Sequence, residues 1–181
     1  MKKKMVKVMG LGLMMSLLMS TVSMAATPQG AELTSTAVES QLLPASQRKS
    51  MSTLRPETKG EAMATRLSII SNEGWGVIGA QAVTTMHIPA SWGMSTIYLD
   101  RWNEGTKNWD LVKTYEKEYL PQDEADGELT SMTYTVLITD QPSDYYYRIR
   151  AIHELEYIRN GHTYWEGAST ETEGLLITNT P

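Results

Sequence analysis

The residues of this chain that could do chemistry are first of all its carboxylates. Glu154 and Glu156 are two positions apart, so a strand would place both side chains on one face. Such a pair serves acid–base catalysis where an apolar pocket raises the pKa of one carboxyl group. The sequence shows neither such a pocket nor the Gly-x-Ser-x-Gly motif of a nucleophilic serine. We predict that the protein is not an enzyme and has no catalytic residues.

Metal binding is the second chemistry to consider. The three histidines, at positions 87, 153 and 162, do not have the close spacing of metal ligands. The acidic loop 123–128 has the oxygen ligands that Ca²⁺ prefers and could hold it weakly, although its spacing does not match an EF-hand. The sequence contains no cysteine, which excludes disulfides and thiolate metal sites. We predict no metal site and no cofactor.

Aromatic side chains are the third candidate for function. They comprise five Trp, nine Tyr and no Phe, and none of them precedes Trp75. Since Phe is absent, Trp and Tyr must supply every aromatic core position, and most of them are expected in the core or in cross-strand pairs. Those left on an exposed sheet face can stack on sugar rings. Tyr146, Trp165 and Trp102 are the candidate ligand-binding residues.

Short strands are the elements expected to position these residues. Period-two alternation predicts strands over residues 66–70, 76–87, 95–102, 109–119 and 131–139, followed by a strand that starts at 145. Pro89 and Gly93 indicate a turn between the second and third strands. About seven short strands without a long amphipathic helix predict an all-β fold, a single antiparallel β-sandwich.

The strongest local signal is Asn160-Gly161, which is typical of a two-residue type I′ hairpin turn. In that register Tyr157 faces Tyr164, and Glu156 faces Trp165. Alternation along the first arm predicts a buried face made of Tyr145, Tyr147, Ile149, Ala151, His153 and Leu155.

The run Tyr145-x-Tyr147-Arg148-Ile149-Arg150-Ala151 resembles the sixth strand of fibronectin type III and related immunoglobulin-like β-sandwiches. The resemblance covers about residues 65–178 and implies that Tyr145 is the corner tyrosine, with its hydroxyl bonded to the main chain of the preceding turn. The predicted strand pair 95–102 and 109–119 is similar to the middle hairpin of small secreted sandwich proteins of Gram-positive bacteria.

The N-terminal region predicts export. Four lysines, an apolar run and the small-x-small sequence Ser23-Met24-Ala25 are typical of a secretory signal peptide over residues 1–25. Residues 26–64 are poor in apolar side chains and are expected to form a flexible leader, so that the sandwich covers residues 65–178. The mature chain is expected to be secreted or loosely associated with the cell envelope, without a membrane span.

Charge narrows the choice of partner. Without the four lysines of residues 1–25, twelve basic residues face 21 acidic ones and the net charge is near −9. Such a surface disfavours nucleic acid and anionic bilayers. We therefore expect a non-enzymatic interaction module that binds an extracellular protein. The alternative is a carbohydrate-binding module that holds a cell-surface glycan on exposed Trp and Tyr.

Overall fold

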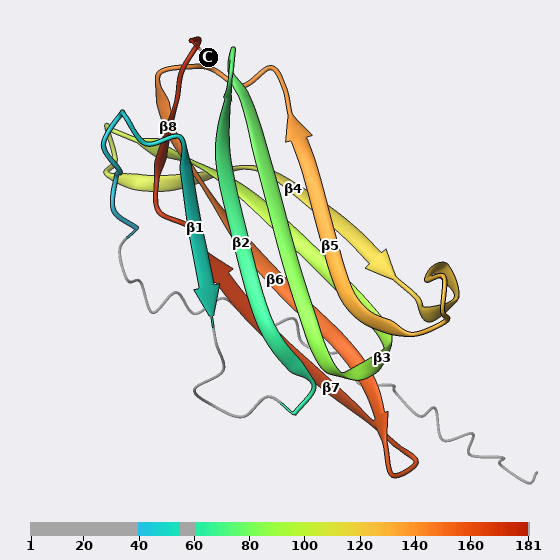
Figure 1. The fold of residues 1–181 in the computed structure, drawn as a ribbon. Coiled ribbons are helices and arrows are strands. Elements are labelled where there is room, and N and C mark those ends of the chain that lie inside the picture. The colour runs from blue at the N-terminus through green and yellow to red at the C-terminus, as the bar shows by residue number, and fades with distance from the viewer. Residues whose placement is uncertain (1–39, 55–60, 181) are drawn as a thin grey trace, which may run out of the picture. The chain divides into compact units, whose positions relative to one another are not determined.

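A computed structural model of the protein describes residues 40–54 and 61–180, and this part of the chain is all-β (Figure 1). The predicted fold class is thus confirmed at that level. The elements are β1 (Lys49–Leu54), β2 (Met63–Gly74), β3 (Val77–Asn103), β4 (Asn108–Tyr119), the 3₁₀ turn η1 (Pro121–Asp123), β5 (Leu129–Ile138), β6 (Tyr145–Arg159), β7 (His162–Glu171) and β8 (Leu175–Ile177). Within the described ranges, no helix has the length and apolar character needed to cross a membrane.

The eight strands form one antiparallel sheet that is organised by β3. This strand has 27 residues and changes its neighbours half way. Up to Thr85 it lies between β2 and β5, and from Gly93 onward it lies between β4 and β6. On the side away from β3, β6 pairs with β7 and with β8. The sheet therefore curls around its own inner face until it is nearly barrel-shaped, where a sandwich of about seven strands was expected (Figure 1).

The turn predicted at Pro89 and Gly93 is wrong, because the second and third predicted strands are one continuous β3. Pro89 lies between Thr85 and Ala90, where the pairing with β5 shifts its register. The missing N–H of Pro89 therefore breaks no regular ladder. Gly93 is needed for close packing, since a Cβ there would lie 2.2 Å from Met132 Sδ.

Residues 40–54 help to close the sheet between β2 and β7–β8. β1 pairs along β2, and Leu42 forms a parallel bridge with Gly174, which lies between β7 and β8. The Leu43 N–H donates to the Gly174 carbonyl oxygen at 2.8 Å. Main-chain pairing therefore holds this segment, although it has few large apolar side chains.

The expected domain boundary consequently differs from the structure. Residues 40–54 belong to the sheet, although they fall inside the segment 26–64 that was predicted to be a flexible leader. The sheet thus begins before residue 65. The predicted signal peptide over residues 1–25 lies outside the described residues, as does the first part of the predicted leader.

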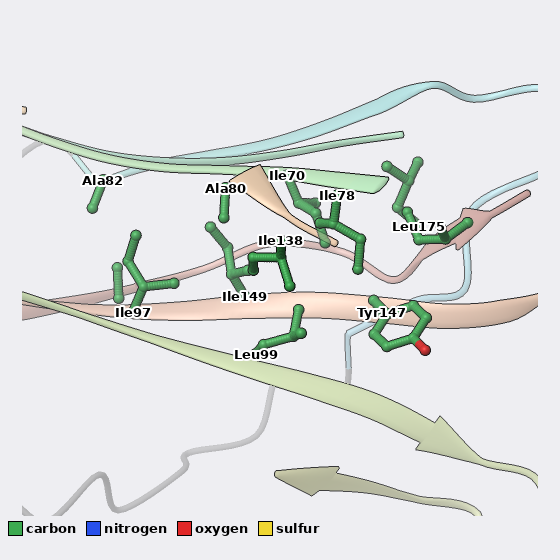
Figure 2. Packing of buried hydrophobic residues seen from close by; sticks show 12 residues of the cluster. Ile70, Ile78, Ala80, Ala82, Ile97, Leu99, Ile138, Tyr147, Ile149 and Leu175 are labelled. Atoms are coloured by element: carbon green, nitrogen blue, oxygen red, sulfur yellow. The ribbon is translucent and has the colours of Figure 1, made fainter. Parts of the chain in front are cut away.

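Two apolar clusters fill the interior. Figure 2 shows Ile70, Ala80 and Ile78 meeting Leu99 and Ile149 from the opposite side in the first cluster. The second cluster is composed of Ala62, Met63, Ala90, Tyr119, Leu129, Met132, Leu155 and Tyr157. Along β2, β3 and β6 the two clusters are separated by buried polar residues, namely Arg66, Ser68, Thr84, Ser95 and His153.

The corner contact is made by Tyr147, and its assignment to Tyr145 is wrong. Tyr147 is fully buried, and its hydroxyl donates to the Pro142 carbonyl oxygen at 2.9 Å. Tyr145 is 48% exposed, with the Arg101 guanidinium 5.1 Å from its ring centroid. As the first residue of β6, Tyr145 lies beyond the apolar cluster. The alternation predicted for the rest of this face, from Tyr147 to Leu155, is confirmed.

The β6–β7 hairpin has the predicted register. Asn160 and Gly161 have φ values of 52° and 76°, as a type I′ turn requires. Tyr157 pairs with Tyr164, and the two rings stack with their centroids 5.5 Å apart.

Removal of the buried hydroxyl in Tyr147→Phe is expected to lower the free energy of unfolding by about 1 kcal/mol, because the Pro142 carbonyl oxygen loses its hydrogen bond. Tyr145→Phe is the matched control and should leave stability unchanged. Urea unfolding followed by fluorescence measures both variants. An equal loss in the two variants would contradict the assignment of the corner to Tyr147.

His153 makes stability depend on pH. Its ring is fully buried, with Nδ1 2.8 Å from Thr84 Oγ1 and Nε2 3.0 Å from Thr170 Oγ1. Burial, followed by the charge of Arg66, lowers the pKa of His153 to about 4. The unfolded chain therefore takes up a proton near pH 6.5 while the folded chain does not, so acid favours unfolding.

We expect the free energy of unfolding to be at its full value, as far as His153 is concerned, above pH 6.5. It should decrease by up to about 3 kcal/mol as the pH falls toward 4. Urea unfolding across this range should show a weaker pH dependence in His153→Gln, whose amide can still bond both threonines. His162→Gln, at an exposed position of the hairpin, should behave as the unmodified protein does. Identical pH dependence in His153→Gln and the unmodified protein would refute the assignment.

Candidate functional site

A row of three side chains crosses the outer face of the sheet next to the β6–β7 hairpin. Trp92 of β3 pairs with Glu156 of β6, and Glu156 pairs with Trp165 of β7. Their neighbours Gly93 and Leu155 are buried, so by alternation the three side chains point outward. Adjacent strands lie about 4.8 Å apart, so the position of Glu156 lies between the positions of the two tryptophans. We call these three residues the Trp–Glu–Trp row.

The indole of Trp165 rests on Gly167 in the same strand. A Cβ at Gly167 would lie within 3.1 Å of three atoms of its six-membered ring, the nearest at 2.3 Å. Glycine is therefore required beneath the ring. Trp165 is 43% exposed, so the ring offers open surface to a ligand.

Carboxylates surround the row. The Trp92 Nε1–H donates to Glu118 Oε1 at 2.6 Å, which orients this indole against β4. Glu154, next to Glu156 on the same face of β6, has a raised pKa because of its burial and the nearby charge of Glu116. The site therefore combines apolar ring surface with acceptors for hydroxyl or ammonium groups.

The three residues predicted to bind ligand do not form one site. Trp165 belongs to the Trp–Glu–Trp row, whereas Tyr146 pairs with Leu176, ten residues from Glu156 along β6 and about 30 Å away. Trp102 packs edge-on against Trp109 with ring centroids 5.3 Å apart, near the Tyr146 end of the sheet.

Sequence reasoning missed Trp92. The residue was placed in a turn because Pro89 and Gly93 flank it, and a turn residue has no assigned face. Alternation carried through a continuous strand would have put Trp92 on the outer face.

A hollow of about 300 Å³ lies beside Trp102 and Tyr145, but its polar groups bond mainly to one another. The Asn103 side chain donates to Asp110 at 2.8 Å and accepts from the Gly105 N–H at 3.0 Å. These interactions explain the turn after β3 and leave few polar atoms directed at a ligand.

A partly buried ion-pair network around the buried Asp100 lies on the same outer face nearer to β8. Asp100 accepts hydrogen bonds from Arg150 at 2.7 and 3.0 Å and from Arg148 at 3.1 Å. Arg148 also pairs with Glu171, and its guanidinium lies 4.6 Å from the Trp109 ring centroid. Two cations thus balance two anions. The bond to Asp100 raises the pKa of Arg150, and the network ties β3, β6 and β7 together.

The arrangement of possible metal ligands was considered next. Within residues 40–54 and 61–180, no group of three or more His, Cys, Asp or Glu is placed to hold a metal ion. In the loop 123–128, Asp126 accepts the Glu128 N–H at 3.0 Å, as in an ordinary turn. His153 is buried in the interior and His162 lies at the hairpin tip.

Comparisons with protein-family models, curated proteins and solved structures found no match to this chain. The all-β antiparallel sheet is therefore known from the structure itself. Kinship with fibronectin type III domains, and similarity to secreted proteins of Gram-positive bacteria, stay predictions.

Proposed function

We propose that this protein is a non-enzymatic binding module that holds a glycan on the Trp–Glu–Trp row. The observation that carries the proposal is the exposed indole of Trp165 on Gly167, with Glu156 and then Trp92 beside it. The C–H face of a sugar ring packs on an aromatic ring, and its hydroxyl groups donate to carboxylates.

The chemistry around the row favours uncharged polysaccharides or amino sugars. Glu116, Glu118, Glu154 and Glu156 would repel an anionic polymer, whereas an ammonium group gains both a carboxylate partner and a cation–π contact. The predicted signal peptide would carry such a module to the outside of the cell, where cell-surface glycans are available. An immunoglobulin-like ancestry would agree with this role.

A protein partner bound at the β4 edge is the second candidate. Within the described residues β4 pairs with β3 alone, and Leu111 and Val112 are 56% and 37% exposed on it. An unpaired strand edge with aliphatic side chains can add a strand from another protein. Lys113 and Lys117 cover the rings of Tyr115 and Tyr119 along the same strand.

Trp165→Ala is expected to weaken binding to an insoluble polysaccharide by about tenfold or more, because it removes the exposed ring of the row. Co-sedimentation of the purified chain with chitin, cellulose and isolated cell walls measures the effect. Trp75→Ala is the matched control, since Trp75 is 72% exposed in the β2–β3 turn and should not affect binding.

The two candidate functions respond differently to further changes. Binding to cell walls that is lost after protease treatment of the walls, and that is weakened by Leu111→Lys but not by Trp165→Ala, would contradict the glycan proposal. That result would assign the function to the β4 edge.

Glu156→Gln tests the charge preference of the row. We expect this variant to lose binding to chitosan several-fold, because the ammonium groups lose their central carboxylate, and to bind chitin nearly as the unmodified protein does. Sedimentation at several salt concentrations measures both, since screening should weaken only the chitosan interaction. An equal loss for both polymers would contradict a charge contact at Glu156.

A further inference from the structure

The curled sheet has an open edge at β5. Among residues 40–54 and 61–180, β5 pairs with β3 alone, and β4 crosses it at an angle without pairing (Figure 1). Over residues 131–138 the β3–β5 register is continuous, without a bulge. Within the described ranges the main chain of β5 makes no main-chain hydrogen bond outside this ladder. An edge strand bonds to its neighbour through only half of its N–H and C=O groups, so the other half of these groups in β5 can pair with a further strand.

β5 lacks the features that commonly keep strand edges from pairing. Charged side chains, prolines and bulges protect such edges. The ten residues of β5 include no charged residue and no proline. The other long edge strand, β4, carries five charged residues, namely Asp110, Lys113, Glu116, Lys117 and Glu118. β5 is therefore the less protected of the two edges.

Both faces of β5 suit an identical strand. Ser131, Thr133 and Thr135 are exposed on its outer face. Cross-strand pairs of Thr with Thr or Ser are favourable in antiparallel sheets. On its inner face Tyr134 and Val136 are only partly buried, at the margin of the first apolar cluster. A second copy of β5 would extend this inner face and cover both side chains.

Charge favours a meeting of two copies at this place. The chain has 21 acidic and 16 basic residues, so two copies repel each other over much of their surface. β5 and the stretch of β3 that pairs with it, residues 78–85, contain no charged residue. When two identical β5 strands pair, each residue meets another from the same uncharged set. No like charges are then opposed.

We propose that β5 is a homodimer interface, in which the β5 strands of two copies pair antiparallel about a two-fold axis. The pairing joins β1, β2, the first half of β3 and β5 of both copies into one continuous sheet. Each copy contributes the same strand, so the contact closes at two chains and does not grow into a fibre. The Trp–Glu–Trp row lies on the second half of β3, on β6 and on β7, and it stays outside the interface.

Sedimentation equilibrium of the purified chain tests the interface. We expect a single monomer–dimer equilibrium over a wide range of protein concentration. Thr133→Lys places like charges in the paired strands and should raise the dimer Kd about tenfold or more. Thr114→Lys makes the same change at an exposed position of β4 and should leave the Kd unchanged. A monomer at every concentration, species larger than a dimer, or equal effects of the two variants would overturn the proposal.

A second variant and a second readout keep the test decisive if Thr133→Lys does not fold. Leu137 is 67% exposed on β5, and Leu137→Lys should also raise the dimer Kd about tenfold or more. Hydrogen exchange should show the β5 amides directed away from β3 protected in the dimer and exchanging quickly in the monomeric variant. An unchanged Kd in Leu137→Lys, or fast exchange of these amides in the dimer, would assign the contact to another surface and overturn the proposal.

Discussion

The structure depends on the hydrogen bonding of β3, a single 27-residue strand that serves two different sets of neighbours. β2 and β5 pair with its first half, and β4 and β6 with its second. A shift of one residue in the β3–β6 register would turn every side chain of one strand to the other face. The register that buries Gly93 and Leu155 is the same register that turns Trp92 and Glu156 outward. Core packing and the Trp–Glu–Trp row therefore have one origin.

The long strands also determine how the interior is arranged. Each of β2, β3 and β6 carries apolar residues at both ends of its inner face and polar residues between them. This arrangement divides the core into two clusters. It also places Arg66 and His153 in the interior, where proteins rarely bury charged or titratable groups. Thr84 and Thr170 satisfy the imidazole of His153, and this explains how a polar layer can persist inside a sheet without disulfides.

The sequence predicted well where the signal was local. Asn160-Gly161 determines its own turn type, so the hairpin register and the Tyr157–Tyr164 pair follow from a few neighbouring residues. Pro89 and Gly93 led to a wrong turn prediction. Proline and glycine are typical of turns, but they also occur where one long strand changes its neighbouring strands, as β3 does here. β1 was missed because it is held by main-chain pairing, and such pairing leaves no apolar pattern. The outer row joins three strands that are far apart in sequence, and only the three-dimensional register reveals it.

The most direct test of a ligand site on the Trp–Glu–Trp row is an NMR titration that follows the five indole N–H signals during addition of a soluble chitin oligosaccharide. The glycan proposal predicts that the signals of Trp92 and Trp165 shift together and saturate, while those of Trp75, Trp102 and Trp109 stay in place. Shifts confined to Trp102 and Trp109, or no shift at any concentration, would contradict it.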